Sequence, residues 1–150
     1  MPRVEFDTTT TLSPEQVTAL LTDFSERRPQ LWPGLWDGAY KAISVGDTTA
    51  EVREGNKSPK VWARERYDWS QPDMVRWEVL ESNFCKPGSF VEAHISAGTP
   101  SGSRVHVVWN RSPSSFMGMV ATAMIVVSRG APVKASLDKG LKKAEAGGGT

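Results

Sequence analysis

Three side chains could take part in proton transfer, because alternation along predicted strands places each at an apolar face: Glu81, Tyr67 and Glu65. Along residues 75–83, one parity carries Val75, Trp77 and Val79. Continuing that parity reaches Glu81 and Asn83, so a carboxyl group and an amide would end an apolar face. Such a position raises the pKa of a carboxyl group and lets it exchange protons near neutral pH. The alternative is that the strand has left the core before Glu81, because polar strand ends are common.

The run 61–69 also alternates, and its two faces differ in charge. One parity consists of Val61, Ala63, Glu65, Tyr67 and Trp69. The other parity carries three charged residues that suit water, so we expect the first set to point inward. Tyr67 would then present a phenol hydroxyl on an apolar ring. Glu65 would be a buried carboxylate, and the alternative to an acid–base role for it is an ion pair with an arginine.

Tryptophan and methionine side chains are typical of a pocket wall. Trp32 and Trp36 lie in a proline-rich connection, where they could hold a flat or acyl ligand or could cap the open end of the core. Trp109 alternates in step with apolar neighbours and belongs to the core or to a pocket wall. A predicted helix presents flexible and small residues: Phe116, Met117, Met119, Val120, Ala123, Met124 and Val127. Unbranched Met adapts to irregular partners, although an apolar helical stripe is also typical of plain core packing.

The remaining chemistry-bearing residues exclude several classes of site. His94 and His106 alternate with apolar residues and are expected on the outer face, with no third ligand at a spacing typical of a metal site. Cys85 is the only cysteine, which rules out an intrachain disulfide and a cysteine-based zinc site. Lys86 could lower the pKa of its thiol, but one charge alone does not indicate a reactive cysteine. Because the sequence also has no nucleophile elbow and no phosphate-binding loop, we expect no metal and no cofactor.

The composition predicts one domain with its own core. We place this domain at residues 1–146 of the 150, followed by a flexible glycine-rich tail at 147–150. The 18 Lys and Arg residues against 17 Asp and Glu leave no basic excess, so nucleic acid is not an expected partner. The apolar share of 39% excludes general disorder. No charged-then-apolar leader opens the chain, and the apolar run 120–127 falls short of the roughly 20 residues of a membrane span, so we expect a cytoplasmic protein.

Strands dominate the chain from Tyr40 onward, where the hydrophobic period is two. Short connections rich in Gly, Pro and Asp separate the runs, which predicts antiparallel hairpins. Before them, an alternating run is followed by a capping box at Ser13 and Gln16, by a helical stripe and by a short helical turn at 25–28. The predicted strands number seven and cover residues 4–12, 40–45, 49–53, 61–69, 75–83, 90–97 and 104–110.

The C-terminal region is expected to form one long helix with a kink. Residues 116–127 are apolar all round and too apolar to face water, so we expect them to cover the sheet. Gly130 and Pro132 interrupt the pattern, which predicts a kink or break at that point. Beyond them, apolar residues repeat at helical spacing with lysines on the other faces: Val133, Leu137, Leu141 and Ala144.

Three stretches carry a resemblance to a known family: LLTDFSERRPQLWPGL (20–35), WARERYDWSQPDMVRWEVLESNFCKPGS (62–89) and SRVHVVWNRS (103–112). Residues 4–144 resemble the START-like helix-grip superfamily, also called SRPBCC, and within it the polyketide cyclase/dehydrase and lipid transport branch. The stretches look like those of bacterial, in particular actinobacterial, members. The resemblance implies an α+β helix-grip fold, in which a seven-stranded curved antiparallel sheet wraps around a long C-terminal helix and two short helices follow the first strand. It also implies a cavity between the concave face of the sheet and that helix.

This resemblance implies that the protein binds or carries a small hydrophobic molecule, such as a lipid, a polyketide or an aromatic metabolite. The residues expected to bind it are Phe6, Trp32, Trp36, Tyr67, Trp77, Val79, Asn83, Trp109, Phe116, Met119, Val120, Ala123 and Met124. The alternative is a cofactor-independent polyketide cyclase or dehydratase in which Glu81, Tyr67 and Glu65 transfer protons. A third class is a membrane- or protein-interaction module built on the apolar segment 116–127 and the Lys-rich segment after it. The identity of the ligand and the oligomeric state stay open at this point.

Overall fold

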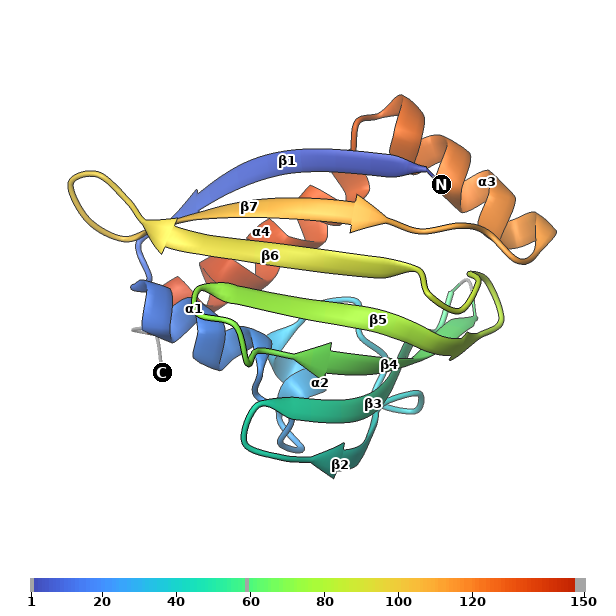
Figure 1. Cartoon of the computed structure of the whole chain (residues 1–150), viewed down its shortest axis with the longest axis horizontal. Coiled ribbons are helices and arrows are strands. Elements are labelled where there is room, and N and C mark those ends of the chain that lie inside the picture. Colours follow the sequence, from blue (N-terminus) through green and yellow to red (C-terminus); the bar gives the residue numbers. More distant parts are fainter. Residues whose placement is uncertain (1, 59, 148–150) are drawn as a thin grey trace.

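The computed structural model describes residues 2–58 and 60–147, so residues 148–150 of the predicted flexible tail lie outside it. Figure 1 shows one curved sheet, with the helices near its two ends and behind it. The strands are β1 (Arg3–Thr10), β2 (Lys41–Val45), β3 (Thr49–Asn56), β4 (Val61–Asp68), β5 (Met74–Ser82), β6 (Phe90–Ala97) and β7 (Ser103–Asn110). The helices are α1 (Pro14–Leu21), α2 (Arg28–Leu31), α3 (Phe116–Val127) and α4 (Ala131–Ala146).

The sheet has seven strands in the order β1-β7-β6-β5-β4-β3-β2, and each neighbouring pair is antiparallel. Strands β2 to β7 form a continuous meander, because each short turn returns the chain beside the strand it has just left. The first strand, β1, pairs with the last strand, β7, and forms one edge of the sheet. The predicted strand number and the antiparallel pairing are therefore confirmed.

Helix α1 begins where the sequence predicts. Ser13 Oγ accepts a hydrogen bond from the Gln16 backbone N–H at 3.2 Å, and Gln16 Oε1 accepts one from the Ser13 N–H at 2.8 Å. The helix buries three residues of its apolar stripe against β5 and β6: Val17, Leu20 and Leu21. Helix α2 starts at Arg28, three residues later than the predicted turn at 25–28. This later start carries the Arg28 side chain into the interior.

The C-terminal region is divided into two helices, which is the break and not the kink of the two predicted alternatives. Their axes are bent by 82° at the break after Val127. Arg129 and Gly130 make this bend with φ of 56° and 84°. A Cβ at position 130 would lie 2.8 Å from Val4 Cγ1, so glycine is required there for both its conformation and its size. The predicted interruption at Gly130 is confirmed.

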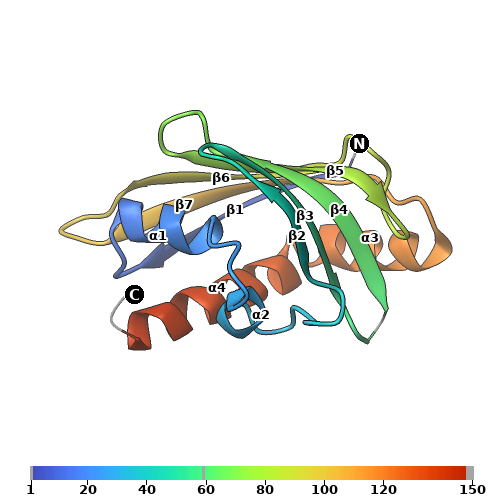
Figure 2. The ribbon, with the colours of Figure 1, turned by 90° about the horizontal axis from the view of Figure 1, so that it is seen from below.

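Helix α4, and not α3, covers the concave face of the sheet. In Figure 2, α4 runs under the sheet on the same side as α1 and α2, whereas α3 lies beyond the end of α4. The prediction that 116–127 covers the sheet is wrong: Phe116 is 81% and Val127 is 84% exposed. The bend turns the chain under the sheet only from Ala131 onward, and Leu141 of α4 reaches the core with 1% exposure.

None of the described helices is by itself long and apolar enough to cross a membrane. Only the bent pair α3 and α4, taken together, reaches that length and composition.

Candidate functional site

A cavity of about 200 Å³ lies between the sheet, α4 and the connection after α2. Its apolar wall combines residues from four elements or connections: Leu21, Trp32, Pro33, Trp77, Val133 and Leu137. Four polar residues share this wall, namely Arg28, Glu54, Tyr67 and Ser136. Such a mixture of apolar surface and a few convergent polar groups is typical of ligand-binding pockets.

A second chamber of about 310 Å³ adjoins the first. Pro33, Glu54 and Ser136 line both spaces, so they form the boundary between them. The second chamber continues to the end of the sheet, where it is lined by Ala63, Glu65, Phe84 and Arg111. The two spaces together therefore contain two arginine and two glutamate side chains beneath an apolar roof.

Arg28 is the most extensively bonded side chain of the first cavity. Its Nε donates to Glu54 Oε1 at 2.8 Å, its Nη2 donates to the Tyr67 hydroxyl at 3.1 Å, and its Nη1 donates to two backbone carbonyls at 3.0 Å each. The Tyr67 hydroxyl in turn donates to Glu54 Oε1 at 3.1 Å. Burial alone would lower the pKa of Arg28, but the Glu54 carboxylate raises that pKa above its ordinary value. Arg28 is therefore a permanently charged group with all three of its nitrogens bonded.

Tyr67 stands at the centre of an aromatic stack. Its ring is stacked on Trp77 with centroids 5.4 Å apart, and Phe24 meets it edge-on at 4.8 Å. Burial raises the pKa of Tyr67 well above its ordinary value, and the Glu54 carboxylate raises it further. At neutral pH the phenol is thus a hydrogen-bond donor and not a base. The predicted inward set of β4 is confirmed, because Ala63, Glu65 and Tyr67 are buried and Arg66 is exposed.

Glu65 faces the second chamber and is paired with an arginine. Arg111, which follows β7, donates from Nη2 to Glu65 Oε2 at 2.8 Å. Burial raises the pKa of Glu65 to about 7, although the Arg111 guanidinium opposes this rise. The predicted inward position of Glu65 is therefore confirmed, and the ion pair with an arginine, which was the alternative to an acid–base role, is present. A carboxyl group that titrates near neutral pH can both donate and accept a proton.

Glu81 and Asn83 do not reach the cavity, so their predicted inward position is wrong. Arg64 pairs with Glu81 while Glu65 pairs with Val79, which leaves Leu80 as an extra residue in β5. This bulge reverses the alternation, and Glu81 lies exposed on the outer face. Asn83 is exposed as well. Its side-chain oxygen accepts a hydrogen bond from the Trp62 backbone N–H at 2.8 Å, which links the residue after β5 to the start of β4.

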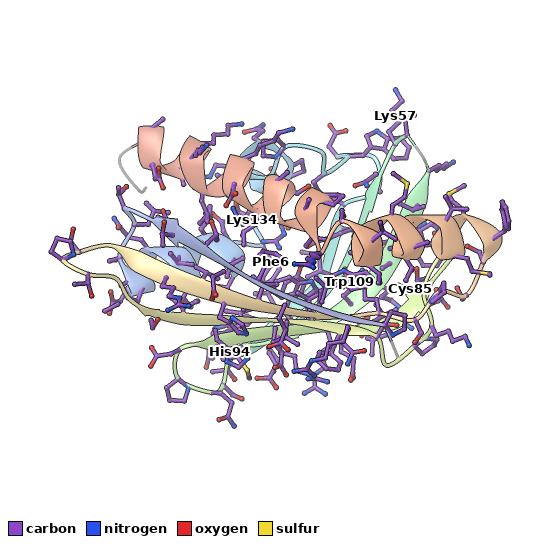
Figure 3. All side chains as sticks on the ribbon, turned by 90° about the horizontal axis from the view of Figure 1, so that it is seen from above. Phe6, Lys57, Cys85, His94, Trp109 and Lys134 are labelled. Carbon is purple, nitrogen blue, oxygen red and sulfur yellow. The ribbon has the colours of Figure 1, made fainter. Side chains whose placement is uncertain are left out.

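Of the other residues predicted to bind the ligand, Trp32, Tyr67 and Trp77 line the first cavity. Phe6 and Trp109 lie between the sheet and the helices (Figure 3), where both belong to the main hydrophobic core and line neither chamber. Val79 is buried in a smaller cluster with Ala63 and Cys85, and Trp36 is half-buried outside both spaces.

The predicted contribution of the segment 116–127 to the cavity wall is also wrong. None of five residues lines either chamber: Phe116, Met119, Val120, Ala123 and Met124. Their place is taken by Val133, Ser136 and Leu137 of α4. The reason is the bend at Gly130, which directs α3 away from the concave face.

Three functional residues were missed in the sequence: Arg28, Glu54 and Arg111. Glu54 could have been found, because Ala50 and Val52 are buried and the same parity continues to Glu54 once β3 is extended beyond its predicted end. Arg28 begins a one-turn helix and Arg111 follows a strand, so no periodic pattern marks either residue.

Cys85 and the two histidines have no part in these chambers. Burial raises the pKa of the Cys85 thiol, which is the opposite of the lowering that Lys86 could have caused. His94 and His106 pair across β6 and β7 on the outer face, as predicted; Figure 3 shows His94 on the side of the sheet away from the helices. Hydrogen bonds that its ring donates to the Glu5 and Asp7 carboxylates raise the pKa of His106. Within residues 2–58 and 60–147, no group of His, Cys, Asp and Glu is arranged to hold a metal ion.

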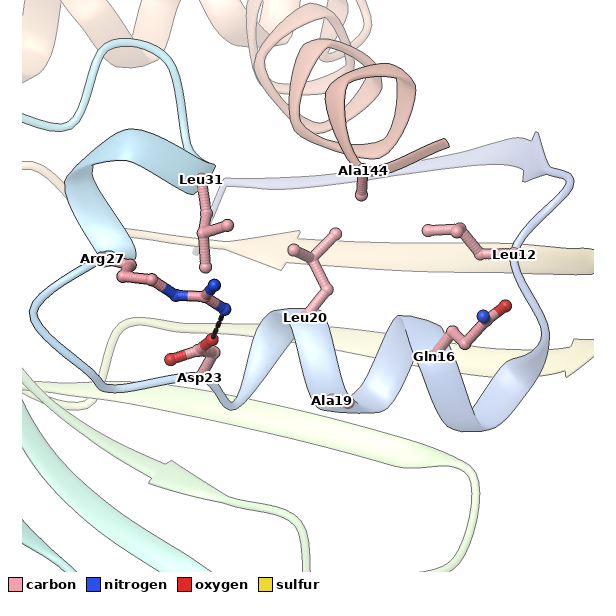
Figure 4. Close-up of a pocket in the computed structure, with 8 residues that line it drawn as sticks. All are labelled: Leu12, Gln16, Ala19, Leu20, Asp23, Arg27, Leu31 and Ala144. Carbon is pink, nitrogen blue, oxygen red and sulfur yellow. Dashed lines mark hydrogen bonds and ion pairs between the residues drawn. The ribbon is translucent and has the colours of Figure 1, made fainter. Parts of the chain in front are cut away.

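A third space, drawn in Figure 4, lies between α1, α2 and α4 but is far smaller. Its volume is about 70 Å³, and its walls are mainly Leu12, Leu20, Leu31 and Ala144. The Arg27–Asp23 ion pair at 3.3 Å stands at its side. It has room for a few water molecules only and is lined by neither Arg28 nor Glu65.

No protein-family model and no curated protein matches the sequence, but solved structures do. TTHA0849 from Thermus thermophilus is 16% identical, with a TM-score of 0.78 over 99% of this chain and 100% of that chain. The ZhuI aromatase/cyclase from Streptomyces sp. R1128 is 16% identical, with a TM-score of 0.72 over 95% and 93% of the two chains. A START superfamily protein from Mycobacterium smegmatis is 11% identical, with a TM-score of 0.71 over 94% and 97%.

These similarities extend over nearly the whole length of all the chains compared, and they include the sheet, the helices after β1 and the C-terminal helix. At such low identity they establish the architecture and leave the activity to be argued from the site. The protein therefore has a START-like helix-grip fold.

Proposed function

We propose that the protein binds a small hydrophobic molecule in the cavity between the sheet and α4. The observation that carries this proposal is the wall of the first cavity, where Trp32, Trp77 and Leu137 surround a polar group made of Arg28, Glu54 and Tyr67. The indole Nε1 of Trp32 is buried without a hydrogen-bond partner among the described residues. A ligand with an apolar body and an oxygen acceptor would satisfy both features of this wall.

Structures of similar fold support this class of ligand. One is a norcoclaurine synthase from Thalictrum flavum in complex with dopamine and hydroxybenzaldehyde, with a TM-score of 0.68 and 10% identity. Another is the ZhuI aromatase/cyclase, with a TM-score of 0.72 and 16% identity. A lipid, a polyketide or an aromatic metabolite fits the cavity by its chemistry, and carriage of such a molecule is the simplest role.

The test is to fill the cavity. Replacement of Leu137 by Trp places a large ring into the first space, while Val127→Trp adds the same side chain on the exposed surface of α3 as a matched control. We expect saturable quenching of tryptophan fluorescence by members of a panel of fatty acids, polyketides and steroids. Leu137→Trp should abolish it, and Val127→Trp should retain it. Absence of saturable binding to the unmodified protein would overturn the proposal, as would unchanged binding to Leu137→Trp.

A second candidate function is a cofactor-independent cyclase or dehydratase. It is favoured by Glu65, a buried carboxyl group with a pKa of about 7 that lines the chamber next to the binding cavity. In this role Glu65 exchanges protons with a bound polyketone, while the neutral Tyr67 hydroxyl turns from Glu54 Oε1 and donates its one hydrogen bond to a carbonyl oxygen of the substrate. Glu65→Gln should lower turnover of such a substrate by about 10²- to 10⁴-fold. Glu81→Gln, the same change on the outer face, should leave turnover unchanged; equal activity of both variants would refute the enzymatic role.

A further inference from the structure

The second chamber contains an arginine with an unused donor. Arg111 keeps only 12% of its side chain exposed, and its Nη2 is bonded to Glu65. Its Nε is buried and has no hydrogen-bond partner among the described residues. Arg28, the other buried arginine, has all three nitrogens bonded. A buried guanidinium N–H without a partner calls for an oxygen acceptor, because buried donors are almost always satisfied.

The position of Arg111 suits the polar end of a ligand. Arg111 lines the chamber of about 310 Å³, and this chamber meets the apolar cavity at Pro33, Glu54 and Ser136. A molecule whose apolar body lies against Trp32 and Trp77 can therefore extend a polar group past Glu54 toward Arg111. Phe84 and Ala63 supply apolar wall beside that group.

The charges around this chamber favour an anion. The Arg28 charge is balanced by Glu54 at 2.8 Å, with the Tyr67 hydroxyl bonded to both groups. Among the described residues, Arg111 forms its ion pair with Glu65 at 2.8 Å, and the Glu54 carboxylate adds a weaker attraction. Tyr67 from β4 and Cys85 from the connection after β5 also face this pair, and both are neutral at physiological pH because burial raises the pKa of each. Once Glu65 is protonated, Arg111 therefore carries the one unbalanced charge of the cluster.

We propose that Arg111 binds the carboxylate of an acidic amphiphile, and that Glu65, where it is still ionised, takes up a proton from solution when the ligand binds. This inference rests on the proposed binding function and names the class of its ligand as an apolar body with a carboxylate. The guanidinium turns from Glu65 to the ligand, and the protonated Glu65 becomes a hydrogen-bond donor to the same carboxylate.

The direction of the pH dependence follows from the ion pair. The pKa of Glu65 is about 7 without ligand, and a carboxylate beside it raises this pKa further. Below pH 7 the Glu65 carboxyl is already protonated, and Arg111 is free to pair with the ligand. As the pH rises above 7, the ligand must compete with ionised Glu65, so its affinity falls by up to about tenfold per pH unit.

A matched pair of ligands tests this inference by calorimetry. The acid 2-naphthoic acid and the alcohol 2-naphthylmethanol share one apolar body, and the acid is ionised from pH 6 to pH 8.5. At pH 6 we expect the acid to bind about tenfold to hundredfold more tightly than the alcohol, which is typical of a charged hydrogen bond. This preference should shrink toward pH 8.5. At pH 7.5, buffers of different ionisation enthalpy should show net uptake of protons with the acid and none with the alcohol.

Variants separate the two proposals. Glu65→Gln keeps the Arg111 charge, so it should bind the acid with an affinity that no longer depends on pH. The double variant Arg111→Gln/Glu65→Gln leaves no lone charge behind; it should bind the alcohol normally and lose the preference for the acid. Arg104→Gln, which removes an exposed arginine paired with Asp7, is the control and should change the binding of neither ligand.

If the alcohol binds and the acid binds no more tightly at any pH, the inference is overturned while the binding function stands. If neither naphthalene ligand binds and no member of the fluorescence panel binds, both are overturned; if neutral members of that panel bind and its carboxylic acids bind no more tightly, only the inference is overturned.

Discussion

At the scale of single residues, the site is a pair of buried ion pairs with different protonation. Arg28 and Glu54 are bonded to each other and both to the Tyr67 hydroxyl, whereas Arg111 and Glu65 are joined by one direct hydrogen bond. Burial away from water disfavours the ionised form of the Glu65 carboxyl. The charge and the hydrogen bond of Arg111 only partly offset this effect, so the pKa of Glu65 is raised to about 7. The two pairs therefore differ in how they respond to pH.

Glu65 should make the stability of the protein fall between pH 4.5 and pH 7. Below about pH 4.5 its carboxyl is protonated in both the folded and the unfolded chain. Between pH 4.5 and about 7 only the folded protein retains the proton, so the free energy of unfolding decreases as the pH rises; above pH 7 this contribution is constant. The decrease attributable to Glu65 is at most about 3 kcal/mol. Urea unfolding of the protein and of Glu65→Gln at pH 4.5 and pH 8 measures it; parallel pH profiles would contradict the expectation.

The Tyr67 hydroxyl should contribute measurably to stability, and Tyr40 provides a matched control. Tyr67→Phe removes the acceptor for Arg28 Nη2 and a donor to Glu54 inside the protein, and should cost about 1–3 kcal/mol in unfolding free energy. The Tyr40 hydroxyl is buried without a hydrogen-bond partner among the described residues, so Tyr40→Phe should be neutral or stabilising. Equal losses for the two variants in urea unfolding would show that the buried network adds nothing.

At the scale of elements, a bulge and a bend decide which side chains reach the cavity. The extra residue Leu80 in β5 turns Glu81 outward, although the pattern up to Val79 is regular. The bend at Arg129 and Gly130 turns α3 away and brings α4 under the sheet. The third hypothesis drawn from the sequence, a membrane- or protein-interaction module, stays a prediction, and its apolar segment is exposed.

Gly130, and not Pro132, should be the critical residue of the bend. Gly130 has φ of 84°, and a Cβ there would meet Val4 and Phe6. Gly130→Ala should therefore cost at least the roughly 1–2 kcal/mol of a left-handed backbone with a Cβ. Pro132 occupies the first turn of α4, where its missing N–H has no helical partner, so Pro132→Ala should have little effect. Thermal unfolding of both variants measures this, and a larger loss for Pro132→Ala would place the constraint elsewhere.

At the scale of the whole molecule, α4 joins the core, the cavity and the first strand. Leu141 is fully buried, and Val133 and Leu137 form part of the cavity wall. Two carboxylates of α4 accept hydrogen bonds from β1: Asp138 from the Thr8 hydroxyl, and Glu145 from the Thr10 hydroxyl at 2.6 Å. A helix that packs on the sheet, closes the cavity and bonds to the edge strand should be indispensable for the fold.

A chain that ends at Arg129 should fail to fold stably. It lacks all of α4, including Leu141, whose burial alone is worth about 1.5–3 kcal/mol against a typical total stability of about 5–15 kcal/mol. A chain that ends at Gly147 retains α4 and serves as the control. Circular dichroism with thermal unfolding distinguishes them. A cooperative transition of the shorter chain near that of the control would mean that the sheet and α1 suffice.

The sequence by itself determined those features that neighbouring residues decide together. The period of two and the short turns predicted seven antiparallel strands, and Ser13 with Gln16 predicted the start of α1. The inward position of Glu65 and Tyr67 also followed from local alternation, because the charged residues of the opposite parity favour water. Resemblance to the START-like proteins added the architecture around them, which similar solved structures confirm.

Only the tertiary structure decided which residues meet in the cavity. Arg28, Glu54 and Arg111 come from a one-turn helix, a strand end and a connection, and they converge because the sheet curves over α4. Periodicity could not show this, since it records which face a residue shares with its neighbours in sequence but not what packs against that face. The exposed position of α3 could not be predicted for the same reason. Its apolar composition predicts that it is buried, but the direction of the chain at Gly130 decides that α4, and not α3, packs on the sheet.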